Sequence, residues 1–183
     1  EQAIALEREM LKPLREKAQY VIDTTSLPTA KLKGELRRLF AKGEQQQGKM
    51  ALRVLSFGFK HGVPMEADLV FDVRFLPNPF YIKGLGSHTG LDADVRDFVL
   101  KNPVTMEFVA KMEELLAFLL PHYQEEGKHR LSIAVGCTGG AHRSVAITER
   151  LGEFLRTKGY QVTVIHRDLA LEQAHWKSSQ EAE

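Results

Sequence analysis

The sequence predicts an α/β fold with a mostly parallel sheet flanked by helices, preceded by a short helix–strand–helix segment. From residue 51 onward, short runs rich in β-branched and aromatic residues alternate with longer amphipathic segments. The strand–helix–strand spacing over residues 131–166 indicates parallel strands, because antiparallel neighbours need only a short turn. Glycines and prolines separate these segments, which supports the boundaries between them.

The composition is that of a globular protein without a membrane span. Of the 183 residues, 43% are hydrophobic and 27% charged, and the formal net charge is +1. That charge is a weak signal for nucleic-acid binding, since dedicated binders are usually more basic. The single cysteine and the lack of a long apolar run lead us to expect a cytoplasmic protein with no membrane partner. The chain begins without Met or a signal peptide, so we expect a piece of a longer protein.

The first 45 residues have the pattern of an incomplete domain. Helical spacing runs over residues 3–18, "YVID" at 20–23 is a short strand candidate, and a second helix follows with Pro28 near its first turn. A single strand would leave its backbone groups without partners. We therefore expect residues 1–45 to be the C-terminal remnant of an N-terminal domain, followed by a polar, glycine-bearing linker at 41–50.

Residues 46–170 carry the regular alternation of a second α/β domain. Asn102 and Pro103 have the positions of an N-cap and a first helical residue, while Pro121 should end or bend that helix. Gly159 has the position of a helix C-terminal stop. The tail at 171–183 has little apolar content, so we predict that it is flexible. The predicted strands cover 51–59, 69–75, 131–136 and 160–166, and the predicted helices cover 91–102, 102–120 and a segment ending at 158.

The stretch "CTGGAHRS" at 137–144 has the features of an anion-binding loop between a strand and a helix. Its glycines allow backbone amides to point inward, and the helix N-terminus adds partial positive charge. Arg143 can make a two-pronged contact with a phosphate, and His142 can donate a hydrogen bond when it is protonated. The predicted phosphate-binding residues are Thr138, Gly139, Gly140, His142, Arg143 and Ser144. The alternative is an ordinary turn with Arg143 facing solvent.

Polar residues after two other strands can face the same loop, because ligands of parallel sheets bind beyond the carboxyl ends of the strands. Lys60 and His61 follow the first strand of this domain, and Asp72 and Arg74 lie near the end of the second. We include these four residues among the candidates for metabolite binding. A solvated lysine, a histidine at the core edge and an internal Asp72–Arg74 pair are the alternatives.

A second chemical interpretation concerns Cys137, which precedes Arg143 by the spacing found in the phosphate loop of Cys-based phosphatases. In that chemistry the thiolate attacks phosphorus, and a carboxylic acid such as Asp72, Asp92 or Asp94 protonates the leaving group. Gly136 departs from the histidine that usually precedes the nucleophile in such enzymes. A buried, inert cysteine is the alternative.

Residues 28–60 carry an excess of basic side chains, which raises the possibility of RNA binding. The RNA-binding candidates are Lys31, Arg37, Arg38 and, after the last strand, Arg167. The simpler interpretation of the same pattern is a solvated helix face and linker. The sequence predicts no metal site.

Four strings, "SFGFKHGVPMEADLVFDVRFLPNPFY", "TGLD", "GCTGGAHRSV" and "HRDL", resemble the C-terminal half of the RapZ/YvcJ family of P-loop nucleotide-binding proteins. The opening "LEREMLKPLREKAQYVIDTTSL" resembles the end of that family's kinase-like N-terminal domain, which accounts for the incomplete first segment. The resemblance implies an ATP or GTP site in the N-terminal domain. This chain has no "GKS" or "GKT" loop, so we expect no nucleotide cofactor within it.

For the C-terminal domain, the resemblance implies a regulatory binding module that senses a phosphorylated amino sugar, glucosamine 6-phosphate. In an RNase adapter of the family it also implies small RNA and an endoribonuclease as partners, and the family implies homo-oligomers. That adapter ends in a basic tail, whereas residues 172–183 here carry Glu172, Glu181 and Glu183 against Lys177. The resemblance thus predicts a phosphosugar site at residues 138–143, with Cys-dependent phosphatase activity as the alternative.

Overall fold

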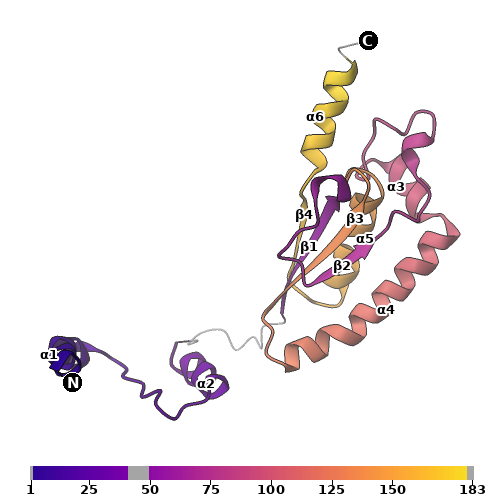
Figure 1. Ribbon diagram of the computed structural model, residues 1–183. Coiled ribbons are helices and arrows are strands. Elements are labelled where there is room, and N and C mark those ends of the chain that lie inside the picture. The colour runs from indigo at the N-terminus through magenta and orange to yellow at the C-terminus, as the bar shows by residue number, and fades with distance from the viewer. Residues whose placement is uncertain (1, 41–49, 181–183) are drawn as a thin grey trace. The chain divides into compact units, whose positions relative to one another are not determined.

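The computed structural model describes residues 2–40 and 50–180, which belong to two compact units (Figure 1). The first unit covers Glu1–Gln47 and the second Gly48–Glu183. The predicted linker at 41–50 falls almost entirely on residues 41–49, outside the described ranges. Within those ranges, no helix is long and apolar enough to cross a bilayer.

The first unit contains two helices, α1 (Gln2–Lys17) and α2 (Thr29–Phe40). The strand predicted at 20–23 is wrong, because these residues have no regular secondary structure. The Asp23 carboxylate instead accepts hydrogen bonds from the amide and hydroxyl of Thr25, which turns the chain. No neighbouring strand is described in this unit to complete a ladder.

The second unit is built on a four-stranded sheet in which every described pairing is parallel, as the sequence predicts. The strand order is β2–β3–β1–β4, so the two central strands are β1 and β3. Their register places Gly58 opposite Cys137 at the carboxyl end. The strands are β1 (Ala51–Gly58), β2 (Leu69–Asp72), β3 (Arg130–Cys137) and β4 (Val162–His166).

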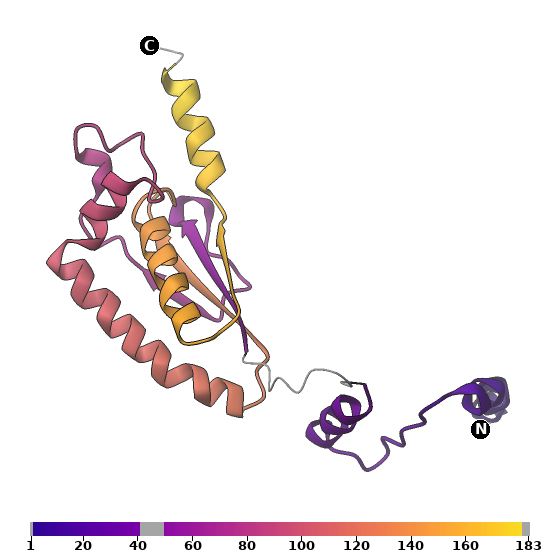
Figure 2. The ribbon, with the colours of Figure 1, turned by 180° about the vertical axis from the view of Figure 1, so that it is seen from behind.

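Helices cover one face of this sheet and form the core with it. Val54 and Ile133 on the central strands are fully buried together with Leu151 of α5, which lies in front of the sheet in Figure 2. Alternate residues of a strand share a face, so the apolar residues of β1 and β3 meet the helices in one layer. The helices are α3 (Ala93–Leu100), α4 (Pro103–Glu125), α5 (Arg143–Thr157) and α6 (Leu169–Gln180), with short 3₁₀ turns η1 (Phe59–His61) and η2 (Pro79–Tyr81).

The loops that follow the two central strands run in opposite directions, which opens a place for a ligand between them. The chain leaves β1 toward β2 at one edge of the sheet, whereas it leaves β3 toward β4 at the other edge. Adjacent parallel strands whose connections diverge leave a crevice at their carboxyl ends, which is where open α/β sheets bind ligands. The loop at 138–142 lies at this point.

Two helix boundaries differ from those predicted, and two agree. Pro121 does not end α4, which continues to Glu125 with the proline inside it. The predicted flexible tail is helical as far as Gln180, because the first turns of α6 contact the domain. The Asn102 side chain does cap α4, and Gly159 follows α5 with a positive φ of 79°.

We predict that Leu151→Ala lowers the free energy of unfolding by about 3 kcal/mol, since Leu151 is fully buried between α5 and the sheet. Leu171→Ala is the matched control, because Leu171 is 57% exposed and should cost less than about 0.5 kcal/mol. Urea unfolding followed by circular dichroism measures both. Equal losses in the two variants would contradict the layered core described above.

Candidate functional site

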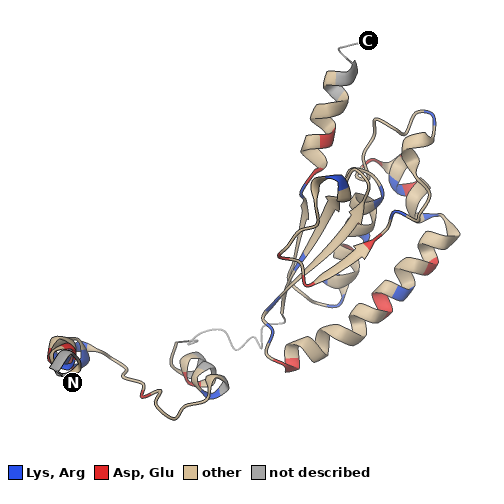
Figure 3. Ribbon diagram, in the orientation of Figure 1, with Lys and Arg blue, Asp and Glu red and all other residues tan. Residues whose placement is uncertain are grey.

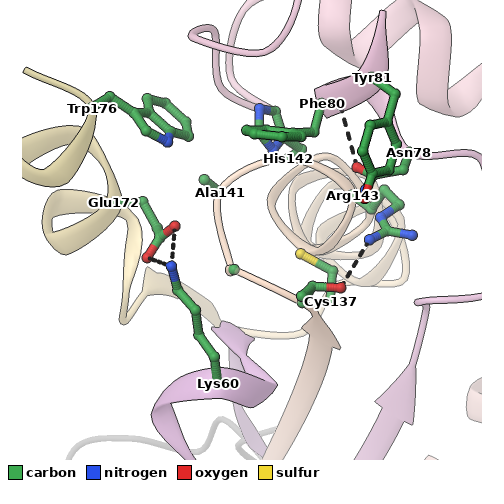
Figure 4. A pocket seen from close by; sticks show the side chains of 12 residues that line it. Lys60, Asn78, Phe80, Tyr81, Cys137, Ala141, His142, Arg143, Glu172 and Trp176 are labelled. Atoms are coloured by element: carbon green, nitrogen blue, oxygen red, sulfur yellow. Dashed lines mark hydrogen bonds and ion pairs between the residues drawn. The ribbon is translucent and has the colours of Figure 1, made fainter. Parts of the chain in front are cut away.

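A cavity of about 210 Å³ lies at the carboxyl ends of β1 and β3, where the sequence predicts an anion site. Four segments line it: the turn after β1, the η2 region, the β3–α5 loop and α6. Figure 4 shows that side chains from all four converge around the loop. The lining residues are Lys60, Asn78, Phe80, Tyr81, Cys137, Thr138, Gly139, Ala141, His142, Arg143, Glu172 and Trp176.

Glycines allow the β3–α5 loop to lie directly on the end of β1. A Cβ atom on Gly58 would be 2.3 Å from the carbonyl oxygen of Gly139, and one on Gly140 would be 2.6 Å from the Gly58 nitrogen. Gly140 also has a φ of 90°, which disfavours other residues. This contact sets the height of the loop above the sheet.

Packing also requires a glycine at position 136, directly before Cys137. A Cβ atom there would be 2.4 Å from the ring of Phe57 and 2.5 Å from the ring of Phe59, so only glycine fits. The two rings lie 4.8 Å apart, and the Arg74 guanidinium lies 4.0 Å above the Phe59 ring. The departure from the usual phosphatase residue at this position therefore follows from aromatic packing beneath the loop.

The Arg143 side chain turns inward instead of facing solvent, and only 4% of the residue is exposed. Its Nη1 donates to the carbonyl oxygens of Arg74 and Leu76 at 2.7 and 2.9 Å, and its Nη2 donates to Thr138 Oγ1 at 3.3 Å. Its Nε is buried without a hydrogen-bond partner among the described residues. One side of the guanidinium thus supports the loop after β2, and the Nε–Nη2 side retains unused donor capacity.

Backbone amides add donors to the same wall of the cavity. The Gly140 amide donates to Cys137 Sγ at 3.3 Å, whereas the amides of Gly139, Ala141 and His142 have no acceptor within the described part of the chain. The loop leads directly into α5, whose N-terminus contributes partial positive charge. Unpaired amides at a helix N-terminus favour an anion.

His142 lies between aromatic side chains at the mouth of the cavity (Figure 4). Its ring is 5.3 Å from Trp176 and 6.5 Å from Phe80, and its Nε2 lies 3.2 Å from the Gly86 carbonyl oxygen. Burial lowers the pKa of His142 below its usual value. The ring is therefore mostly neutral at neutral pH. Its hydrogen is on Nε2, which donates a hydrogen bond to the Gly86 carbonyl oxygen.

Lys60 and His61 meet the carboxylate of Glu172, which lies on α6. Lys60 Nζ is 2.7 Å from Oε1 and 2.8 Å from Oε2, and His61 Nε2 is 2.9 Å from Oε1. Burial raises the pKa of Glu172, but hydrogen bonds from Lys60 and His61 outweigh it and leave the pKa below its usual value. The carboxylate is therefore ionised at neutral pH.

The Cys137 thiol is buried and lies 3.1 Å from the Ser144 hydroxyl, which is itself fully buried behind the loop. Cys137 also borders the cavity. Two donors, the Gly140 amide and the Ser144 hydroxyl, can thus reach its sulfur. Ser144 contacts Cys137 but does not line the cavity itself.

The remaining strand-end candidates lie outside the cavity lining. Asp72 and Arg74 form a two-pronged ion pair with each other, at 2.6 to 3.0 Å, with both side chains nearly half exposed. Asp92 accepts from Thr89, and Asp94 pairs with the ring of His88. No aspartate proposed as a leaving-group acid therefore borders the cavity.

The residues proposed for RNA binding are divided between the two units of the chain. Arg167 donates to both oxygens of Asp168 and to the Gly62 carbonyl oxygen, so its side chain holds the start of α6. Lys31 is exposed on α2, in the other unit, and the side chains of Arg37 and Arg38 lie outside what is described. Figure 3 shows acidic and basic positions interspersed over the second unit. The described residues also contain no cluster suited to a metal ion.

Sequence reasoning missed two groups of lining residues. Glu172 and Trp176 lie in the segment predicted to be a flexible tail, although Leu169, Glu172 and Trp176 recur at helical spacing and mark one face of a helix. Phe80 and Tyr81 lie in the long loop predicted after β2, where no periodic pattern exists. Neighbouring aromatics in such a loop are the available signal.

Comparison with known proteins gives two consecutive family matches. Residues 50–170 match the RapZ C-terminal domain, and residues 1–45 match the RapZ-like N-terminal domain. The chain belongs to the RapZ family. The family match also agrees with the resemblance noted in the sequence, and its boundary near residue 50 lies close to that between the two compact units.

Several RapZ-family relatives are described as nucleotide-binding proteins. One from Alkaliphilus oremlandii (strain OhILAs) is 53% identical over 167 residues, which are 91% of this chain and 57% of the relative. Another, from Caldicellulosiruptor saccharolyticus, is 48% identical over 92% of this chain and 57% of its own length. One from Clostridioides difficile (strain 630) is 47% identical over 93% of this chain and 59% of its own length. The chain thus spans little more than half the length of these relatives.

We predict that Gly140→Ala lowers the free energy of unfolding by about 3 kcal/mol, through a left-handed backbone and a collision with β1. Gly84→Ala is the matched control, since Gly84 has a similar φ of 88° but no atom within 4 Å of an added Cβ. It should cost only about 1 kcal/mol. Urea denaturation measures the free energy of unfolding of both variants. An equal loss in the two would show that the loop does not rest on β1.

Proposed function

We propose that the second unit is a regulatory binding module that holds a phosphorylated metabolite in the cavity at the β3–α5 loop. The observation that carries the proposal is the buried Arg143 guanidinium, which borders the cavity with its Nε unpartnered. Phosphate oxygens are ligands that match the two parallel donors of an arginine edge. The unpaired amides of the loop and the N-terminus of α5 supply further donors.

The other walls of the cavity suit a sugar attached to that phosphate. Aromatic side chains of Phe80, Tyr81 and Trp176 offer apolar faces, while Asn78 and Glu172 offer polar atoms. A small cavity with mostly apolar walls and a few placed polar groups is typical of a metabolite site. A compound like glucosamine 6-phosphate fits this combination of an anionic end and a polar ring.

Calorimetric titration with glucosamine 6-phosphate and with inorganic phosphate tests the proposal. We expect saturable heat from both, with tighter binding of the sugar phosphate. Arg143→Lys should weaken binding by about 1.5–3 kcal/mol, because lysine retains the charge but not the fork. Arg74→Lys is the matched control and should leave binding unchanged, since the Arg74 side chain faces Asp72 and Phe59. Folding of each variant is checked by circular dichroism. No heat from either compound at about millimolar concentration, in folded protein, would contradict the proposal.

A second candidate function, Cys-dependent phosphatase activity, rests on the position of Cys137 at the cavity wall. The Gly140 amide and the Ser144 hydroxyl can both donate to its sulfur, and the residue borders the cavity proposed for the phosphate. In this chemistry the sulfur forms a bond to phosphorus as the alkoxide or phenolate leaves, and water then cleaves the phosphocysteine. Glu172 is the one carboxylate among the described lining residues, and it is ionised, so only substrates with good leaving groups should react.

Hydrolysis of p-nitrophenyl phosphate tests this candidate, because its leaving group needs no acid. If Cys137 is the nucleophile, turnover should disappear in Cys137→Ser and persist in Asp72→Asn, whose carboxylate lies outside the cavity lining. Turnover that survives in Cys137→Ser would exclude Cys137 as the nucleophile. Absence of turnover in the unmodified chain would leave the binding module as the function.

The remaining family-based expectations stay predictions for this chain. They include binding of ATP or GTP by the N-terminal domain, contact with small RNA and an endoribonuclease, homo-oligomers and a cytoplasmic location. Its relatives are named for nucleotide binding, and the chain spans 57% of the length of the relative from Alkaliphilus. Support for the metabolite proposal therefore comes from the second unit, where the cavity lies.

A further inference from the structure

Glu172 presents an open hydrogen-bond acceptor beside the anion-binding loop. Its Oε1 accepts from both Lys60 and His61, whereas its Oε2 accepts only from Lys60 among the described residues. An ionised carboxylate oxygen can accept two hydrogen bonds, so Oε2 retains one position. A Cβ atom on Gly139 would lie 2.9 Å from Oε2, which places this oxygen against the loop that lines the cavity.

The position and charge of this carboxylate are held by its surroundings. The side chain of Glu172 is only 8% exposed. Lys60 and His61, from the turn after β1, both contact its Oε1. On the same helix, Leu169 packs with Ala141 and Val145, and Trp176 packs against this group. Figure 4 shows Glu172 and Trp176 on one face of α6, directed toward the loop, with Arg143 on the opposite side of it.

The cavity therefore has two ends of different character. Arg143 and the amides of the loop offer donors to an anion, whereas Oε2 of Glu172 offers an acceptor. A hydroxyl or ammonium group at the second end would complete the hydrogen bonding of Oε2. A carboxylate or second phosphate at Oε2 would meet a like charge at short range, which is unfavourable in a site shielded from water. The Lys60 ammonium lies at the same end of the cavity, but it is already paired with both oxygens of Glu172.

We propose that Glu172 determines the specificity of this cavity, selecting phosphate monoesters whose other end is a hydrogen-bond donor and rejecting those whose other end is an anion. This inference rests on the proposed phosphate site at Arg143 and extends it to the ligand class. The selecting residue belongs to α6, whereas the phosphate-binding residues belong to the β3–α5 loop. Anion capture and ligand choice are thus assigned to separate segments of the domain.

The test compares dissociation constants of three compounds that share a 6-phosphate: glucosamine 6-phosphate, glucose 6-phosphate and 6-phosphogluconate. The first two are ring sugars with an ammonium or a hydroxyl at C2, and the third is an open-chain acid with a carboxylate at C1. We expect the unmodified chain to bind the first two at least about tenfold more tightly than the third, a difference of about 1.4 kcal/mol. The single tryptophan, Trp176, lines the cavity and provides a fluorescence readout beside calorimetry.

Glu172→Gln should bring the three dissociation constants to within about threefold of one another, since the amide keeps the shape and removes the charge. Glu172→Asp, which keeps the charge but reaches less far, should still disfavour 6-phosphogluconate. Glu125→Gln on α4 is the control, because Glu125 is 75% exposed and does not line the cavity. Circular dichroism confirms folding of each variant.

The outcomes separate this inference from the function on which it rests. Phosphate esters that bind with the same selectivity in the unmodified chain and in Glu172→Gln would overturn the role of Glu172 and leave the phosphate site intact. Loss of selectivity in both Glu172→Gln and Glu172→Asp would also overturn it, because loosening of α6 would then explain the effect. If neither inorganic phosphate nor any of the three esters binds the unmodified chain, both proposals fail.

Discussion

The buried guanidinium of Arg143 links the parts of the candidate site. Through Nη1 it ties the first turn of α5 to the carbonyl oxygens of Arg74 and Leu76 after β2, and through Nη2 it reaches Thr138. Burying a charged group is costly unless hydrogen bonds compensate for lost hydration. The two carbonyl oxygens supply much of that compensation. The Nε donor has no hydrogen-bond partner among the described residues, and a bound anion would provide one.

The glycine contacts beneath this arginine are equally necessary. Gly58 and Gly140 let the loop lie on the end of β1, and Gly136 leaves room for two phenylalanine rings. The loop consequently has little freedom to shift, because backbone meets backbone with no side chain between. A rigid loop loses less entropy when a ligand binds, which favours recognition of a small molecule by few contacts.

Much of the second unit could be predicted from the sequence because its signals are local. Apolar runs predict β1 and β3, and parallel strands bring Lys60 and the 138–143 loop to one edge. The strand predicted at 20–23 is wrong because strand formation depends on distant partners, which local propensity does not report. The side chains of Asp72 and Arg74 form an ion pair with each other instead of facing the cavity. The spacing of the two residues in the sequence does not determine which way their side chains point. Glu172 was missed because the mostly polar composition of its segment concealed a short stripe at helical spacing.

The last described helix has a consequence for how such domains diversify. Its side chains form one wall of the cavity, yet it follows the final strand and adds nothing to the sheet. Substitutions on its inward face can accumulate while the core and the anion loop stay unchanged. Under the proposed function, homologous domains with the same glycine-rich loop would therefore differ in ligand according to the chemistry that this helix presents.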